Sequence, residues 1–237
     1  MTLADEINNS ISDIMTKYWN VRDANTVPSD SDLSLTGNVV RIQGTVLYAD
    51  MKESSELVND VNQPVAGRVI QSYLRSIARL ITDSGGTITA YDGDRIMGIF
   101  VGTNKNTSAA ICALKINYVV SYILKPKLTN HFKSINTSGF VISHCTGIDT
   151  GNILAVKAGQ CNANDIVWIG RPPNLAAKLS EIRNNGYNSF ISSEVYSALN
   201  DSAKLGGEKN EPIWNMFTHD YLGKPLMVYG SHWWHST

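Results

Sequence analysis

Hydrophobic residues near the start of the chain recur at helical spacing. Within residues 1–20 they form one stripe, which predicts an amphipathic helix that docks on the rest of the chain or on a partner chain. The stripe consists of Ile7, Ile11, Ile14 and Tyr18. Residues 23–38 are polar and rich in turn formers, which is typical of a linker. We therefore expect an N-terminal helix and linker over residues 1–38 and a main domain over residues 39–237.

The main domain alternates between strand and helix patterns. The expected strands are residues 46–49, 87–91, 95–101, 138–146, 152–157, a short one near Phe190, and 226–229. The expected helices are residues 65–82, 108–124, one that follows Pro172-Pro173, and a short one from Ser193. Asp92-Gly93 between two strand patterns indicates a hairpin, and a second turn is expected at residues 149–151. This order predicts an α+β fold, with helices on one face of a mainly antiparallel sheet.

Composition and charge narrow the classes of function. The chain has 237 residues, of which 43% are hydrophobic and 17% charged, and its net charge is -1. That charge argues against broad nucleic-acid binding, which needs a dense basic face. No secretory signal is visible, and Lys115 and Asn117 interrupt the apolar stretch 111–124, so we expect no membrane span. The sequence predicts a soluble, cytoplasmic protein.

Three cysteines, Cys112, Cys145 and Cys161, are scattered without a CxxC spacing. They indicate reduced thiols of a cytosolic protein, and not a disulfide framework or a zinc site.

Two aspartates follow strand patterns. Asp50 ends an apolar strand and Asp94 follows the hairpin turn. If the first strand lies beside the hairpin, both carboxylates converge on one edge, where they suit a hard divalent cation. The alternative is that Asp50 caps the next segment and Asp94 is a turn residue. The spacing alone leaves both interpretations open.

Four segments occur in the order typical of one enzyme family. They are GTVLYADMKESSELV (44–58), TAYDGDRIMGIF (89–100), VWIGRPPNLAAKL (167–179) and YLGKPLMVYG (221–230). With these segments the chain resembles the class III nucleotidyl cyclases over residues 39–229. The resemblance implies the ferredoxin-like fold of that family and cyclisation of a nucleoside triphosphate.

The resemblance also implies roles for single residues. Asp50 and Asp94, with the carbonyl of Met51, would hold two Mn²⁺ or Mg²⁺ ions in each active site. Asn174 would orient the ribose, Lys178 or Arg183 would stabilise charge on the α-phosphate, and Lys224 would bind the triphosphate. Lys178 stands where the family usually has an arginine, and a lysine lacks the planar two-pronged donor set. Without the resemblance, a helix cap and solvated surface lysines would explain Asn174, Lys178 and Lys224.

In this family the aspartates and the other site residues come from different protomers. A homodimer with two equivalent sites at its interface is therefore implied.

The positions that contact the base depart from the purine cyclases. A lysine usually stands where this chain has Ala90, and an acid or threonine where it has Val167. Tyr48 and Trp168 are bulky and would narrow the pocket while offering a hydroxyl and an indole N–H. This combination favours a pyrimidine, although both aromatic residues would equally serve as core filling.

In these features the chain is similar to the stand-alone uridylate cyclases of bacterial antiphage signalling, the Pycsar system. The resemblance implies UTP in preference to CTP, 3′,5′-cyclic UMP as the product, and a separate effector protein that responds to it. An adenylate or guanylate cyclase remains an alternative. Another alternative is a regulator that binds a nucleotide without catalysis. Two departures from the family pattern favour it: Lys178 in place of an arginine, and DMKESS, where the family usually has Gly-Phe-Thr after the metal-binding aspartate.

Overall fold

The computed structural model describes residues 1–35, 37–160, 163–183 and 186–237. Cys161 lies outside these residues, so its state stays a prediction. Cys112 and Cys145 are buried free thiols, and burial raises the pKa of each to about 12.

A nine-stranded sheet forms the centre of the chain. Its order is β10-β11-β7-β5-β2-β4-β3, with β1 paired to β2 and β6 paired to β5. In the described residues β1–β2 and β5–β7 are parallel and the other pairings antiparallel, which confirms a mainly antiparallel sheet. Its strands are β1 (Asn20–Ala24), β2 (Asn38–Lys52), β3 (Thr87–Asp92), β4 (Arg95–Phe100), β5 (Ser143–Gln160), β6 (Ala163–Ile169), β7 (Ser189–Ser192), β10 (Asn215–Tyr221) and β11 (Lys224–Ser231). A separate hairpin joins β8 (Leu205–Gly206) to β9 (Glu211–Pro212).

Two long strands, β2 and β5, run side by side through the sheet. The turn expected at residues 149–151 is wrong, because β5 continues through it. Asp149 pairs with Val46 and Gly151 with Gly44, so the backbone there stays in the ladder. The pattern predicted two short strands because turn-forming residues interrupt an otherwise apolar run.

The expected linker also contains regular structure. β1 begins at Asn20 and lies parallel to the start of β2, and the 3₁₀ helix η1 (Asp30–Asp32) follows. Most side chains of β1 are exposed, so the sequence carries no alternation that would reveal the strand. Part of the expected linker therefore belongs to the sheet, while the division of the chain at residue 38 stays a prediction.

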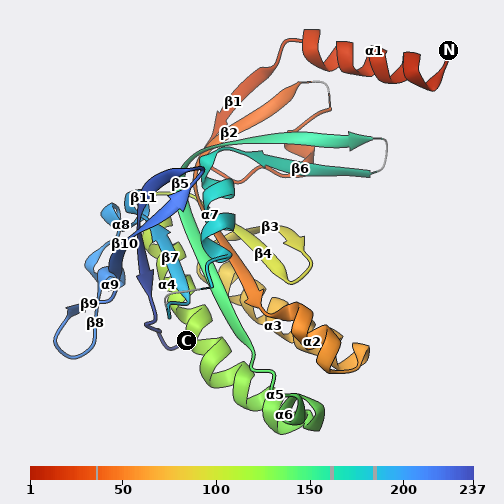
Figure 1. The fold of residues 1–237 in the computed structure, drawn as a ribbon. Helices are drawn as coiled ribbons and strands as arrows, with labels where there is room; N and C mark the ends of the chain where they lie inside the picture. The colour runs from red at the N-terminus through yellow and green to blue at the C-terminus, as the bar shows by residue number, and fades with distance from the viewer. Residues whose placement is uncertain (36, 161–162, 184–185) are drawn as a thin grey trace.

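The helices cover both faces of the sheet. They are α1 (Leu3–Thr16), α2 (Ser54–Asp60), α3 (Gln63–Asp83), α4 (Lys105–Tyr118), the π-helix η2 (Val119–Leu124), α5 (Lys125–His131), α6 (Lys133–Ser138), α7 (Arg171–Ser180), α8 (Ser193–Ser197) and α9 (Asp201–Lys204). Leu47 and Ala49 of β2 join the core of α3 and α4, whereas Val46 joins a cluster with Ala176 of α7. Successive strand residues point to opposite faces, so α7 lies opposite α3 and α4 (Figure 1). The expectation of helices on a single face is wrong in this respect.

α7 approaches the sheet closely over Gly147 of β5. A Cβ atom there would lie 2.1 Å from the carbonyl oxygen of Ala176, so no larger residue fits without moving the helix. This contact places α7 directly on β5 and β2.

The helical run Lys105–His131 is long and apolar enough to cross a membrane by length and composition. Of its most apolar 18-residue window, 61% is buried inside the protein, and residues such as Leu114 and Ile116 belong to the hydrophobic core.

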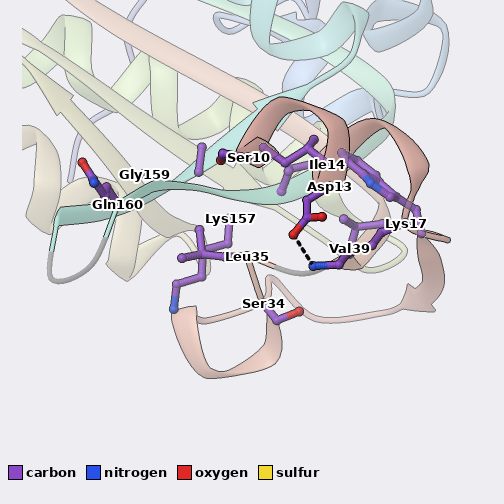
Figure 2. A pocket seen from close by; sticks show the side chains of 14 residues that line it. Ser10, Asp13, Ile14, Lys17, Ser34, Leu35, Val39, Lys157, Gly159 and Gln160 are labelled. Carbon is purple, nitrogen blue, oxygen red and sulfur yellow. Dashed lines mark hydrogen bonds and ion pairs between the residues drawn. The ribbon is translucent and has the colours of Figure 1, made fainter. Parts of the chain in front are cut away.

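α1 extends away from the sheet (Figure 1), and all of its side chains are exposed. A capping box of Thr2 and Asp5 begins the helix. Between α1 and the ends of β2 and β5 lies a cavity of about 470 Å³, with the Asp13–Lys17 ion pair at its wall (Figure 2). None of the site residues predicted from the sequence lines this cavity.

Candidate active site

Asp50 and Asp94 line one cavity of about 420 Å³, which we call the aspartate cavity. Asp50 lies near the end of β2, and Asp94 lies in the two-residue turn between β3 and β4. Gly93 in that turn has a φ of 61°, which a glycine adopts without strain. The ten lining residues are Asp50, Met51, Glu53, Ser54, Ser55, Asp92, Gly93, Asp94, Arg95 and Arg183.

The electrostatics of Asp50 reflect its burial. Its side chain is 8% exposed, and burial raises the pKa of the carboxyl. The hydrogen bond and charge of Arg183 oppose that rise, and the negative charge of Asp94 adds to it. Asp50 and Asp94 are therefore close enough to repel each other, and a shared cation would relieve that repulsion.

The aspartate cavity fits a divalent cation that shares its ligands with a substrate. In the described part of the chain, no group of three or more His, Cys, Asp or Glu side chains could hold a metal by itself. Two carboxylates and the Met51 backbone leave coordination positions for phosphate oxygens and water, which is how Mg²⁺ is commonly bound.

Arg183 lies in a place that the sequence did not predict. α7 ends at Ser180, so Arg183 lies beyond the helix and not within it. Its Nη2 donates a hydrogen bond to Asp50 Oδ2 of the same chain, and its Nη1 donates to the Ser180 carbonyl oxygen at 2.8 Å. Arg183 thus approaches the aspartate cavity from its own chain.

The expected base-contacting residues come together in a second cavity of about 330 Å³, which we call the aromatic cavity. Its lining residues carry no charged side chain. They are Tyr48, Ala90, Met97, Ile166, Val167, Trp168, Pro173, Asn174 and Ala177. Strands β2, β3, β4 and β6 and helix α7 contribute to it. Residues far apart in the sequence therefore meet there, as a pocket for one ring requires.

Polar groups in the aromatic cavity are few. The indole Nε1 of Trp168 is buried and has no hydrogen-bond partner among the described residues. Burial also raises the pKa of the Tyr48 hydroxyl, which therefore remains a neutral donor. A buried donor without a partner is costly, so the indole N–H would be stabilised by an acceptor, which the described residues do not supply.

An ionic cluster fixes the start of α7, which carries Asn174. Arg171 binds Glu194 with both arms of its guanidinium, at 2.5 and 3.0 Å, and its Nε lies 3.6 Å from Asp149 Oδ2. Asp149 is fully buried. Its burial raises its pKa to about 6, although Ser192 and Arg171 oppose the rise.

Two predicted phosphate-binding lysines lie outside both cavities. Lys178 is 60% exposed and pairs with Glu181 at 3.0 Å. Lys224 begins β11 and is exposed. Within one chain, the described residues therefore do not assemble the complete predicted site.

Sequence analysis missed Arg95, which lines the aspartate cavity. Arg95 binds Asp92 at 2.6 Å and Glu181 at 3.2 Å, so it ties the hairpin to the end of α7. Its position directly after Asp94 is the signal that could have revealed it.

Several proteins with similar sequences are named cyclases. The chain is 37% identical over 234 residues to a uridylate cyclase of Rhodovulum sp. (strain MB263), covering 99% of this chain and 98% of that protein. A uridylate cyclase of Xanthomonas perforans is also 37% identical, covering 98% of each chain. No protein-family model matches the chain.

Solved structures show the same fold at low sequence identity. The guanylyl cyclase Cya2 has a TM-score of 0.66 and 20% identity, covering 81% of this chain and 92% of its own. The adenylyl cyclase CyaB from P. aeruginosa has a TM-score of 0.60 and 21% identity, covering 82% and 95%. The expected fold class is confirmed. This chain therefore belongs to the family of the uridylate cyclases and is a nucleotide cyclase, with the fold of the adenylyl and guanylyl cyclases.

Proposed function

We propose that the chain converts UTP to 3′,5′-cyclic UMP and pyrophosphate. The observation that carries this proposal is the uncharged lining of the aromatic cavity, which includes Tyr48 and Trp168, and the buried indole N–H of Trp168 has no partner among the described residues. Uracil presents two carbonyl acceptors, which suit the donors of Trp168 and Tyr48. The relatives at 37% identity, named uridylate cyclases, support the same choice.

Cytosine and the purines suit this cavity less well. Cytosine and adenine each present an amino group that needs an acceptor. Positions 90 and 167, where purine cyclases carry polar side chains, hold Ala90 and Val167. A site that recognises a base by buried hydrogen bonds discriminates strongly against a base that leaves them unmade.

We assign a separate catalytic role to each of several residues in this sequence. Asp50 and Asp94, with the Met51 carbonyl, would hold two Mn²⁺ or Mg²⁺ ions. These ions would activate the ribose 3′-hydroxyl and neutralise charge on the triphosphate. Asn174 would orient the ribose, so that the 3′-oxygen gives up its proton to solvent and bonds to the α-phosphorus, while the bond from the α-phosphorus to the bridging α–β oxygen breaks and pyrophosphate leaves.

We propose that the working unit is a homodimer. Asn174 lines the aromatic cavity, and Lys178 and Lys224 lie outside the aspartate cavity. A two-fold axis that brings the aromatic cavity of one chain to the aspartate cavity of the other would complete two equivalent sites. Lys178 and Lys224 would then meet the phosphates of a nucleotide bound by the partner's aspartates.

The biological setting follows from the resemblance to the Pycsar cyclases. We propose that the enzyme acts in the cytoplasm, and that cyclic UMP activates a separate effector protein during antiphage defence. Expression with that effector should lower phage plating efficiency, and Asp94→Ala should abolish the protection. Equal plating with the wild type and the variant would contradict this role.

The activity is tested by incubating the purified protein separately with ATP, GTP, CTP and UTP, with Mn²⁺ or Mg²⁺. Products are identified by mass spectrometry, and Asp94→Ala controls for contaminating enzymes. We expect cyclic UMP from UTP, absent in the variant. A cyclic purine would overturn the base assignment, and no product from any nucleotide would overturn the proposed activity.

A further inference from the structure

Hydrogen bonds hold the guanidinium of Arg183 beside the aspartate cavity. Its guanidinium donates to the Ser180 carbonyl at the end of α7 and to Asp50 Oδ2 on β2. The side chain is 38% exposed, so its outer part faces the cavity and solvent. Arg183 therefore contacts a predicted metal ligand from the same chain.

The ion pair with Arg183 compensates the negative charge of the buried Asp50 carboxylate. The Asp50 carboxylate is almost fully buried, and Arg183 is its ion-pair partner among the described residues. Removing one partner of a buried pair leaves an uncompensated charge, which is strongly destabilising. Arg183 can leave Asp50 at little cost when another cation takes its place.

Arg95, the other cationic side chain that lines the aspartate cavity, has different partners from Arg183. Arg95 is held by Asp92 and Glu181, and neither acid is a predicted metal ligand. A divalent cation at Asp50 and Asp94 would thus release the guanidinium of Arg183 and leave that of Arg95 paired. The released group would face the cavity where the phosphates must lie.

We infer that Arg183 is a phosphate-binding residue that pairs with Asp50 until metal and nucleotide arrive, an inference that rests on the proposed function. Asp50 exchanges a guanidinium for a divalent cation, and Arg183 exchanges a carboxylate for a phosphate of the substrate. A guanidinium binds either anion with paired hydrogen bonds. The exchange keeps the buried carboxylate neutralised before and after substrate binding. Arg183 thus serves the phosphates of the nucleotide whose metal ions its own chain holds.

The exchange predicts opposite effects on two affinities. Mn²⁺ binding is measured by calorimetry without nucleotide, where Arg183→Ala should bind about 3- to 10-fold more tightly because its competitor is gone. Binding of 3′-deoxy-UTP, which lacks the attacking hydroxyl, is measured in saturating Mn²⁺. There Arg183→Ala should bind about 10-fold or more weakly, from the loss of a charge-assisted contact.

Two further variants keep the test decisive. Arg95→Ala is the matched control, and it should change both affinities less because its acid partners do not take up metal. Arg183→Lys keeps the charge at Asp50, so it serves if Arg183→Ala fails to fold. It should weaken 3′-deoxy-UTP binding while changing Mn²⁺ affinity little.

Weaker or unchanged Mn²⁺ binding by Arg183→Ala, or unchanged nucleotide binding, would overturn the exchange. Both measurements are of binding, so a protein that made no cyclic product would contradict the proposed activity without deciding the exchange. The titration is repeated with 3′-deoxy-ATP, which has the same phosphates and a different base. A loss of affinity in Arg183→Ala with either nucleotide supports the role of Arg183, whichever base the wild type prefers.

Discussion

The two cavities of the candidate site differ in how they are built. The aspartate cavity is lined by four acids and two arginines, whereas none of the described residues that line the aromatic cavity is charged. The first is suited to cations and phosphates, which every nucleoside triphosphate shares. The second is suited to an uncharged ring, which differs from one nucleotide to the next. Changes in the first should therefore affect all substrates alike, and changes in the second should alter the choice among them.

The largest effect is expected at the turn of the hairpin. Asp94→Ala should lower kcat/KM by about 10³-fold or more for every nucleotide accepted, which corresponds to about 4 kcal/mol, because metal binding would be lost. Asp92→Ala is the matched control, because Asp92 lines the same cavity but is 69% exposed and already paired with Arg95. Initial rates with each nucleotide decide the point, and equal losses in both variants would contradict the assignment.

The second-largest effect is expected at Asp149, which belongs to the ionic cluster at the start of α7. This helix carries Asn174, which lines the aromatic cavity. The pKa of Asp149 is about 6, raised from 3.8 by burial, so the folded state binds this proton more tightly than the unfolded state. The stability that this proton supplies is present at low pH and is lost as the pH rises from about 4 to about 6. Over that window the wild type should lose about 2–3 kcal/mol relative to Asp149→Asn.

Urea unfolding of both proteins at several pH values from 4 to 7 measures this difference. Parallel stability curves would show that Asp149 titrates normally. The ion pairs of Arg95 and Arg183 at the aspartate cavity do not involve Asp149. A change in metal affinity by Asp149→Asn would therefore contradict the view that the two cavities act independently.

A smaller effect is expected from the indole of the aromatic cavity. Trp168→Phe keeps the ring and removes the N–H, so kcat/KM for UTP should fall about 10- to 30-fold, or about 1–2 kcal/mol. Inhibition by inorganic triphosphate, which has no base, should not change. Trp214→Phe is the matched control, because its Nε1 donates to the Ala203 carbonyl within the core and should affect stability alone. An unchanged preference for UTP in Trp168→Phe would remove this residue from base recognition.

The smallest effect is expected at α1. None of its residues is buried, so deleting residues 1–16 should change the free energy of unfolding by less than about 0.5 kcal/mol in a dilute monomer. A thermal melt at low protein concentration measures this. A large loss of stability would show that α1 docks on the sheet.

The sequence and the structure agree best where local pattern decides the element. The helix α3 and the hairpin of β3 and β4 follow from apolar spacing and from Asp92-Gly93. The pattern failed where pairing overrides it, as in β5, which continues through Asp149 and Gly151 because β2 pairs along its length.

The site was predictable in part for similar reasons. Motifs placed Tyr48, Ala90, Val167 and Trp168 beside the base and Asn174 beside the ribose, and the structure brings all five into one cavity. Nothing local to the sequence indicated that Arg183 would contact a carboxylate 133 residues away. Contacts of that kind depend on how α7 ends over the sheet, which no spacing rule specifies.

The central claim is that the aspartate cavity of one chain works with the aromatic cavity of another. Its most direct test is the activity of a mixture of Asp94→Ala and Asn174→Ala proteins, each inactive or nearly so by itself. If the claim holds, half of the dimers in an equal mixture contain one intact site. About a quarter of the wild-type rate of cyclic nucleotide formation should then return. A mixture that stays as inactive as its components would contradict the claim and place the whole site within one chain.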